Sequence, residues 1–328
     1  MRPSKLPDMP ILSDDELAWL LPPSDLIESV RHAMLWDEQN PGQVPQRMHI
    51  NRGTDTFLFM PAFGPGVHGT KLVSVLPANR LAGRPIISGT YLLFDSQTGD
   101  ELLQTSAAGI TALRTGAIAA VAVDVLAPND IDSVGIIGCG VQATAAARLM
   151  AHVRPVKTLY CHSRRPESVD RLREAVAAVA PDVRVQTCAD SREVLDATST
   201  VITATTSPHP VLPDDARLLE GKTFIAMGAY RSTMRELPDA VFRLTDALTI
   251  DAEGARRETG DALYPVENKL LDEQDVFTLG KVMLGLRRLK SSTRVFKSAG
   301  YALFDLFTAH RAWEKCNDSK MPPNPLES

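Results

Sequence analysis

The sequence predicts an α/β protein in which a domain with a doubly wound parallel sheet accompanies an α+β N-terminal domain. From Ser133 onward, short apolar strands alternate with helical segments, and this alternation is typical of a parallel sheet. Earlier in the chain, closely spaced strands without intervening helices favour an antiparallel or mixed sheet. The 328 residues, 44% of them hydrophobic, suffice for two domains with large cores.

The N-terminal part begins as helix and continues as strands. Ile11–Gln39 is predicted to be helical, with Ser13 and Glu16 at the spacing of a capping box and a second helix that starts at Pro23-Ser24. The predicted strands, separated by turn residues, are Gln46–Asn51, Thr56–Met60, Gly69–Val75 and Ser88–Phe94. A long alanine-rich helix is predicted at Thr105–Leu126.

The second part repeats a strand-and-helix rhythm. Its predicted strands are Val134–Ile137, Thr158–Cys161, Val183–Thr187, Thr200–Thr205, Thr223–Met227 and Ala247–Ile250. Helices are predicted at Ala143–His152 and Pro166–Val179, and a further amphipathic helix at Ser298–Trp313. Met321–Ser328, with three prolines, is predicted to be a loose end.

Composition narrows the class of protein. The net charge of −5 and the lack of a long basic stripe argue against a nucleic-acid partner. The four cysteines are widely spaced without a Cys-x-x-Cys pair, which indicates reduced thiols and no metal site. Met1–Pro10 lacks the apolar core of a signal peptide, and no stretch approaches the roughly 20 apolar residues of a membrane helix. We therefore expect a cytoplasmic protein without a membrane partner.

The sharpest local motif is a glycine-rich turn between a predicted strand and a predicted helix. It reads Gly138-Cys139-Gly140-Val141-Gln142-Ala143. Gly138 permits the tight turn, Gly140 leaves space for a pyrophosphate, and the small Ala143 lets the helix pack near the sheet. The N–H groups of the first helical turn then face the phosphate charge, so the motif predicts a nicotinamide dinucleotide site of the Rossmann type.

The next strand indicates which cofactor is preferred. An NAD site usually has Asp or Glu at the tip of this strand, whereas here the tip carries Ser163, Arg164 and Arg165. Arginine binds a 2′-phosphate with forked hydrogen bonds, so the sequence favours NADP(H). NAD(H) stays open as the alternative, because Glu167 follows closely enough to reverse the choice.

Together the motifs make the chain resemble the ornithine cyclodeaminase/mu-crystallin family over most of its length. The matching segments include Pro45–Arg47, Met60–Ala62, Gly69–Val73, Pro77–Asn79, Thr111–Thr115, Gly138–Ala143, Thr203–Ser207, Met227–Leu237, Glu258–Asp261 and Val295–Gly300. The resemblance implies a substrate and dimerisation domain, here residues 1–125 and 300–328, around a dinucleotide-binding domain, residues 126–299. It also implies a homodimer and a small amino or imino acid as substrate.

The resemblance carries substrate-binding roles onto Arg47, Lys71, Arg114 and Thr115. Three cations that converge on one cleft would bind a carboxylate. Lys71, Arg114 and Tyr230 are the expected catalytic residues, and Lys71 is the candidate general acid, with a pKa that the two arginines should lower. His68 is a candidate proton relay. Asp305 matches a family acid that is expected to approach the nicotinamide or to pair with a neighbour.

Further cofactor contacts are expected where strands of the dinucleotide domain end, because such loops line the cofactor crevice. These residues are Thr205, Thr206, Ser207, Met227, Gly228 and Lys297, in addition to Gly138, Gly140, Val141, Gln142, Ala143, Ser163, Arg164 and Arg165.

Two departures from the family pattern bear on the reaction. Tyr230 stands where cyclodeaminases and the related alanine dehydrogenases carry an aspartate, and Leu58 replaces a second family carboxylate. Tyrosine, with a pKa near 10, is a poor base at neutral pH, so ornithine cyclisation is disfavoured. Tyr230 is instead expected to donate a hydrogen bond to substrate or to stack on the nicotinamide.

Three functions stay open from the sequence. The first is an NAD(P)H-dependent imine reductase, or an amino-acid or N-substituted amino-acid dehydrogenase. The second is an ornithine- or lysine-type cyclodeaminase that releases ammonia. The third is a non-catalytic NADPH-binding protein of the crystallin kind.

Overall fold

The computed structural model describes residues 9–42 and 44–318. The chain divides into two compact units: unit 1 comprises Met1–Arg114 with Ala302–Ser328, and unit 2 comprises Thr115–Tyr301. The boundary between them falls inside one long helix, α3, Ala107–Leu126. The predicted loose end, Met321–Ser328, and most of the N-terminal Met1–Pro10 segment lie outside the described residues.

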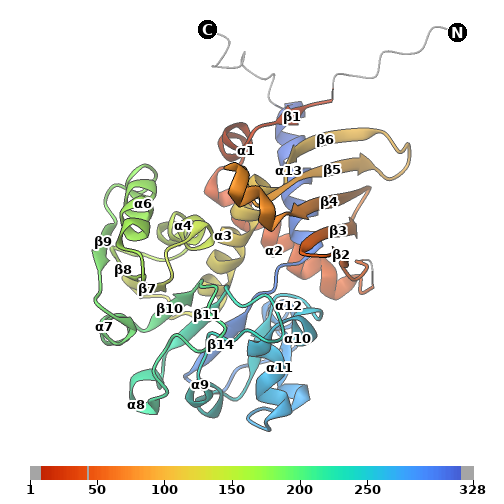
Figure 1. Ribbon diagram of the computed structural model, residues 1–328. Helices are drawn as coiled ribbons and strands as arrows, with labels where there is room; N and C mark the ends of the chain where they lie inside the picture. Colours follow the sequence, from red (N-terminus) through yellow and green to blue (C-terminus); the bar gives the residue numbers. More distant parts are fainter. Residues whose placement is uncertain (1–8, 43, 319–328) are drawn as a thin grey trace, which may run out of the picture. The chain divides into compact units, whose positions relative to one another are not determined.

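Unit 1 contains one mixed sheet of six strands in the order β1-β6-β5-β4-β3-β2 (Figure 1). Neighbours from β2 to β6 are antiparallel, whereas β1 is parallel to β6, as expected for an α+β domain. Its elements are β1 Ile11–Leu12, α1 Asp14–Leu20, α2 Pro23–Gln39, β2 Met48–Arg52, β3 Asp55–Phe63, β4 Val67–Val75, the 3-10 helix η1 Pro77–Ala82, β5 Ile87–Asp95, β6 Glu101–Ser106 and α13 Ala302–Asp318.

Helix α13 covers this sheet although it comes from the far end of the chain. It contacts β3, β4, β5 and β6 on one side and α2 on the other. Leu303, Leu306 and Ala309 are fully buried on it, as expected for the apolar face of an amphipathic helix. The prediction placed this helix at Ser298–Trp313, whereas it begins at Ala302 and extends to Asp318.

The start of the chain confirms the second helix predicted from Pro23-Ser24, but Ile11–Leu12, predicted to be helical, is a strand. Ile11–Leu12 pairs with β6, and two helices follow, because Pro22 and Pro23 interrupt the helical hydrogen-bond ladder. The predicted capping box is confirmed: the hydroxyl of Ser13 accepts from the Glu16 backbone N–H, and the Glu16 carboxylate accepts from the Ser13 N–H.

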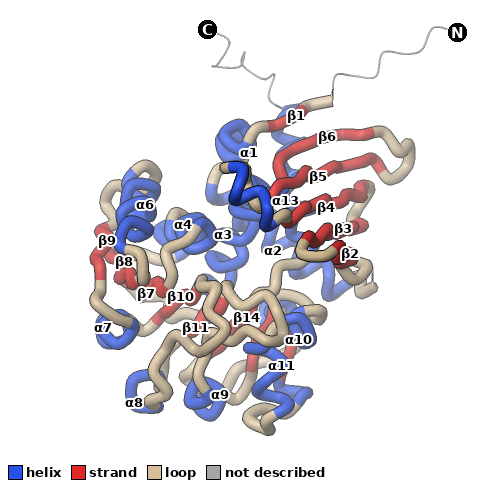
Figure 2. The backbone as a smooth tube through the Cα atoms, viewed as in Figure 1, coloured by secondary structure: helices blue, strands red, loops and turns tan. Residues whose placement is uncertain are grey.

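Unit 2 contains eight parallel strands in the order β13-β12-β14-β11-β10-β7-β8-β9, which confirms the predicted doubly wound sheet (Figure 2). Its strands are β7 Ser133–Ile137, β8 Thr158–His162, β9 Arg184–Thr187, β10 Thr200–Thr203, β11 Thr223–Ala226, β12 Leu248–Ile250, β13 Val276–Thr278 and β14 Arg294–Lys297. Its helices, besides the end of α3, are α4 Val141–Ala147, α5 Met150–Val153, α6 Pro166–Ala177, α7 Ser191–Ala197, α8 Ala216–Leu219, α9 Asp239–Leu244, α10 Ala255–Glu258, α11 Gly260–Glu267, the 3-10 helix η2 Glu273–Asp275 and α12 Leu279–Met283.

Some elements were not predicted. They include the strands β6, β13 and β14, and β14 inserts between β11 and β12, so the last strands do not lie in sequence order. The predicted helix Ala143–His152 is divided into α4 and α5.

Helix α3 corrects the expectation that no stretch approaches the length of a membrane helix. Its 20 residues are long and apolar enough by composition alone, but 67% of the most apolar stretch is buried inside the structure. Gly116 lies so close to Ala145 that an added Cβ would be 2.7 Å from the Ala145 backbone. We therefore interpret α3 as a core helix.

Candidate functional site

Unit 1 contains a buried cluster of charged residues, Lys71, Arg114 and Asp305, which we call the basic cluster. The Lys71 Nζ on β4 donates to Asp305 Oδ2 at 2.8 Å and to Thr111 Oγ1 at 3.0 Å. The Arg114 Nε on α3 donates to the other carboxylate oxygen, Asp305 Oδ1, at 3.1 Å. Asp305 on α13 thus bridges two cations, and it is fully buried.

The surroundings shift the proton affinity of these groups. Burial lowers the pKa of Lys71 to about 8, because desolvation outweighs the stabilising charge of Asp305, and Arg114 and Arg47 lower it further. Burial alone would raise the pKa of Asp305, but Lys71 and Arg114 together hold it below its ordinary value. The predicted direction for Lys71 is confirmed, but its main cause is burial rather than the arginines.

The cluster carries more positive than negative charge. Arg114 donates to Asp305 through Nε, and among the described residues no hydrogen bond is formed by its terminal nitrogens, Nη1 and Nη2. Lys71 uses two of its three N–H groups on Thr111 and Asp305. With Arg47 close enough to act on the Lys71 pKa, the arrangement suits an additional anion such as a carboxylate.

The sequence identified all three charged members of this cluster, and the expected pairing of Asp305 with a neighbour is confirmed, but Thr111 was not singled out. The predicted residues Lys71 and Arg114 are brought together, and Arg47 lies half-buried just before β2. Thr115 is buried next to Arg114 in the sequence. Adjacent helical residues point in different directions, so the side chain of Thr115 does not share the helix face of Arg114. Thr111, one turn earlier, shares a helix face with Arg114, and this i, i+3 spacing could have identified it.

The position of His68 on β4 corrects the prediction that it is a proton relay for Lys71. His68 and Lys71 lie an odd number of residues apart on β4, so their side chains point to opposite faces. His68 stacks between Phe63 and Phe94, at ring-centroid distances of 5.8 and 5.2 Å, and it is not a relay to Lys71.

Unit 2 contains the glycine-rich turn between β7 and α4. Gly138 adopts a positive φ of 87°, and an added Cβ would be 2.6 Å from Thr205 Cγ2, so only glycine fits this turn. Gly140 has an ordinary φ of −84° with open space around it, and no side chain caps the helix that starts at Val141. Ala143 is fully buried.

This geometry fits a dinucleotide. The uncapped N–H groups at the start of α4 and the open space at Gly140 are what a pyrophosphate needs. Val141 is 71% exposed at the head of α4, while Gln142 is half-buried, and its Oε1 has no hydrogen-bond partner among the described residues.

The predicted 2′-phosphate residues follow β8, which is the strand next to β7. Arg164 and Arg165 are exposed there, and the hydroxyl of Ser163 accepts a hydrogen bond from the backbone N–H of Arg165 at 3.3 Å. The side chains of both arginines are therefore accessible at the carboxyl end of the sheet.

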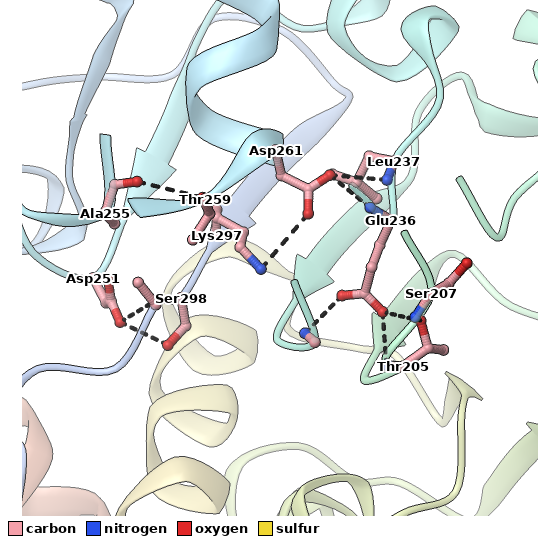
Figure 3. Close-up of polar contacts among 12 residues, drawn as sticks. Thr205, Ser207, Glu236, Leu237, Asp251, Ala255, Thr259, Asp261, Lys297 and Ser298 are labelled. Atoms are coloured by element: carbon pink, nitrogen blue, oxygen red, sulfur yellow. Dashed lines mark hydrogen bonds and ion pairs between the residues drawn. The ribbon is translucent and has the colours of Figure 1, made fainter. Parts of the chain in front are cut away.

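The carboxyl ends of β10 and β11 are joined by a residue that the sequence did not identify, Glu236 (Figure 3). Its Oε1 accepts from the Thr205 backbone N–H at 2.7 Å and from the Thr205 hydroxyl at 2.8 Å, and its Oε2 accepts from the Gly228 N–H at 2.6 Å. Ser207 N–H donates to the Thr205 hydroxyl at 3.2 Å. Three of the expected cofactor residues thus belong to one hydrogen-bonded set.

Lys297, expected to contact the cofactor, ends β14 fully buried beside Asp261. Their charged atoms, Lys297 Nζ and Asp261 Oδ2, are 3.6 Å apart, and neither atom has a hydrogen-bond partner among the described residues. Burial raises the pKa of Asp261 to about 6, against the opposing effect of the Lys297 charge. The signal for Asp261 was present in the Glu258–Asp261 motif, but nothing in the sequence indicated its partner.

The remaining predicted residues of unit 2 lie in the same loops. Thr206 is exposed and Met227 is half-buried. Tyr230 is 53% exposed, and the Arg231 guanidinium lies 5.4 Å from its ring centroid. The ring of Tyr230 is accessible for a ligand.

The comparisons with known proteins agree with this geometry. Residues 20–320 match the model of the ornithine cyclodeaminase/mu-crystallin family. A Delta(1)-pyrroline-2-carboxylate reductase of Bacillus cereus is 30% identical over 80% of this chain and 82% of its own length. The ketimine reductase mu-crystallin of Mus musculus is 30% identical over 80% of each chain.

A solved structure shares the whole fold. It is the Delta(1)-pyrroline-2-carboxylate reductase of Thermococcus litoralis in complex with NADH and L-proline, with a TM-score of 0.86 and 29% identity. The match covers 96% of this chain and 100% of that one. By sequence and by fold, this chain belongs to the ornithine cyclodeaminase/mu-crystallin family.

Proposed function

We propose that the protein is an NAD(P)H-dependent oxidoreductase that reduces the C=N bond of a small 2-imino acid, or oxidises the corresponding amino acid. Cyclic substrates such as Δ1-pyrroline-2-carboxylate, named for its relatives, are the first to test. The proposal depends above all on the buried bridge Lys71–Asp305–Arg114, which presents a surplus of positive charge. In this proposal unit 1 binds the substrate and unit 2 binds the cofactor.

Arg114 is the proposed anchor for the substrate carboxylate. Asp305 holds its Nε, and this fixes the plane of the guanidinium while the terminal nitrogens bind a ligand. Planar, forked hydrogen bonds of this kind orient a carboxylate as well as binding it. Arg47, also near Lys71, adds positive charge for the same group.

Lys71 is the proposed proton donor. Its amino group is held by Asp305 and Thr111, which leaves one N–H for the substrate nitrogen. With a pKa near 8 it is protonated at neutral pH and still acidic enough to release the proton. A bound reduced nicotinamide would supply the hydride for the imine carbon.

The surroundings of Lys71 disfavour a cyclodeaminase. Leu58 pairs with Val73 on β4, and Met60 pairs with Lys71. Leu58 therefore lies on the same sheet face as Lys71, where it supplies an apolar side chain instead of a carboxylate base. The aspartate expected of cyclodeaminases is Tyr230 in this chain.

We also propose a preference for NADP(H) over NAD(H). The exposed arginines after β8, Arg164 and Arg165, support it, since they are accessible to a 2′-phosphate. Replacing both with serine is expected to lower the kcat/KM ratio of NADPH to NADH by at least about tenfold, which corresponds to about 1.4 kcal/mol. An unchanged ratio would contradict the preference.

A homodimer is proposed from the surface of unit 1. Edge strand β2 is exposed at all five positions, and its apolar residues Met48 and Ile50 are 52% and 47% exposed on one face. Ile87 on β5 is 59% exposed. An exposed apolar edge strand is stabilised by a partner that covers it.

The test of the function is a direct assay. Purified protein is mixed with NADPH or NADH and cyclic 2-imino acids, with the decarboxylated imines as controls, and cofactor oxidation is followed. Oxidation is expected only with the acids. Arg114→Ala is expected to lower kcat/KM by about 100- to 1,000-fold, since two hydrogen bonds to a charged group contribute about 3–4 kcal/mol.

The same variant should keep the wild-type Kd for the cofactor. Turnover of the decarboxylated imines at the same rate as the acids would refute the proposed role of the basic cluster. Release of ammonia from ornithine without net change in the cofactor would support a cyclodeaminase instead.

A further inference from the structure

Three neighbouring strands of unit 2 end in loops that are connected to one another by buried polar groups. In the sheet order these strands are β14, β11 and β10. Ligands of open α/β sheets bind outside the carboxyl ends of the strands, so these loops lie where the proposed cofactor would bind. Glu236 stands between them with no exposed surface.

Both carboxylate oxygens of Glu236 accept hydrogen bonds from these loops. Three donors reach the carboxylate within 2.6–2.8 Å, two from Thr205 and one from Gly228. A buried carboxylate is costly unless such donors compensate for lost hydration, so the loops and the charge depend on each other. Figure 3 shows the side chain of Glu236 between the two loops.

The two loops are in close contact at the same point. A Cβ added to Gly228 would lie 2.1 Å from the Thr205 carbonyl oxygen and 2.6 Å from Glu236 Oε1. Thr205 in turn packs against the glycine-rich turn, since a Cβ added to Gly138 would lie 2.6 Å from Thr205 Cγ2. A shift of Thr205 therefore affects the pyrophosphate turn and the loop after β11 together.

The backbone of Glu236 is itself anchored. Asp261 Oδ1 accepts from the N–H groups of Glu236 and Leu237 at 2.9 and 3.0 Å. Its other oxygen, Oδ2, faces Lys297 Nζ at the end of β14. The segment that carries Glu236 is thus tied to a third strand.

We propose that Glu236 is a positioning residue for the nicotinamide cofactor: its carboxylate locks the loops after β10 and β11 and so fixes where the reactive ring is held. This inference rests on the proposed function. Glu236 acts through Thr205 and Gly228, and no direct contact with the cofactor is required. Glutamine has the same shape but only one acceptor oxygen, so it leaves at least one of the N–H groups of Thr205 and Gly228 facing an amide NH2.

The test compares Glu236→Gln with Asp246→Asn. Asp246 is a control, because its carboxylate also accepts two backbone N–H groups, of Lys290 and Ser291, but it precedes β12 and so lies at the amino end of a strand rather than at the carboxyl ends. Amide hydrogen exchange is measured at Thr205 and Gly228 without cofactor. Glu236→Gln is expected to speed exchange there at least about tenfold, and Asp246→Asn is expected to leave it unchanged.

A second measurement reports on the reaction. With NADPH deuterated at the transferred position, Glu236→Gln should show a lower kcat and a larger isotope effect on kcat than the wild type, because a displaced ring makes hydride transfer slower. Asp246→Asn should retain the wild-type isotope effect. If Glu236→Gln does not fold, Thr205→Val removes the hydroxyl that donates to Glu236 and accepts from the Ser207 N–H, and it must raise the isotope effect in the same direction.

The outcomes separate this inference from the proposed function. A wild-type protein that binds neither NADPH nor NADH would refute the function, and the role of Glu236 with it. A wild-type protein that turns over while Glu236→Gln keeps the wild-type exchange, kcat and isotope effect would refute the role of Glu236 alone.

Discussion

The proton on Lys71 is the property of a single residue on which the proposed chemistry depends. Its pKa, lowered to about 8 mainly by burial, lies within the range in which enzymes are assayed. If the protonated amine is the active form, kcat/KM should stay level below pH 8 and fall about tenfold per pH unit above it. Lys71→Arg, which stays charged, should show no such break near pH 8 whatever activity it keeps. A wild-type profile that is flat to well above pH 9 would contradict the assignment.

Asp261 is a buried acid whose raised pKa predicts how the stability of the fold depends on pH. Its pKa is raised from 3.8 to about 6, so between these values the unfolded chain loses the proton while the folded protein keeps it. This carboxyl therefore favours the folded state at low pH, and its contribution is lost as the pH rises toward 6. The difference is on the order of 1–3 kcal/mol.

The measurement is the free energy of unfolding by urea from pH 4 to pH 6 in wild type and Asp261→Asn. The variant should lack this part of the decline, so the free energy of unfolding of the wild type minus that of the variant should fall as the pH rises. Parallel curves would show that Asp261 is not protonated in the folded state.

Single residues were predictable where the residue type itself indicates the role, as a cation does for carboxylate binding. Lys71 and Arg114 stood out as cations in family-like motifs, and the structure brings them together. Glu236 did not stand out, because its role depends on three donors that lie 8 and 31 positions away in the sequence. His68 was misassigned, since closeness to Lys71 along a strand does not place two side chains on the same face.

At the level of elements, the turn between β7 and α4 predicts different effects on stability for alanine substitutions at its two glycines. Gly138→Ala should destabilise the fold by about 1–3 kcal/mol from the positive φ alone, with the collision against Thr205 added to it. Gly140→Ala should change the free energy of unfolding by less than about 0.5 kcal/mol, because the φ is ordinary and the space is open.

Gly140→Ala should therefore weaken cofactor binding without lowering the stability of the fold, whereas Gly138→Ala should lower the stability. Gly140→Ala is expected to be well folded yet to bind NADPH at least about tenfold more weakly, since its methyl group occupies the pyrophosphate space. Thermal unfolding and cofactor titration of both proteins test this. Tight binding by Gly140→Ala would place the pyrophosphate elsewhere.

The long helices were predicted closely, whereas two of the last strands were not predicted. The helices α3 and α6 begin and end within about two residues of their predicted bounds. The strands β13 and β14 contain three and four residues, and β14 ends in a buried lysine that opposes an apolar pattern. Their place in the sheet is set by packing between distant segments, which local sequence does not report.

For the whole molecule, the proposed dimer makes the clearest prediction. The double variant Met48→Asp and Ile50→Asp adds charges to the exposed face of β2 and should raise the dimer dissociation constant by at least about 100-fold. Sedimentation of the two proteins at equal concentration measures it. Leu286→Asp, at a 67% exposed position in unit 2, is the control that should stay dimeric. A double variant as dimeric as the wild type would place the interface on another surface.

Helix α13 has a consequence for how the protein is made. Lys71 and its counter-ion Asp305 are separated by 234 positions, so a nascent chain exposes the lysine on the order of tens of seconds before the aspartate leaves the ribosome. The uninterrupted segment 115–301 is synthesised in full during this interval and can mature first. Translation therefore delivers unit 2 complete, while the sheet of unit 1 waits for helix α13.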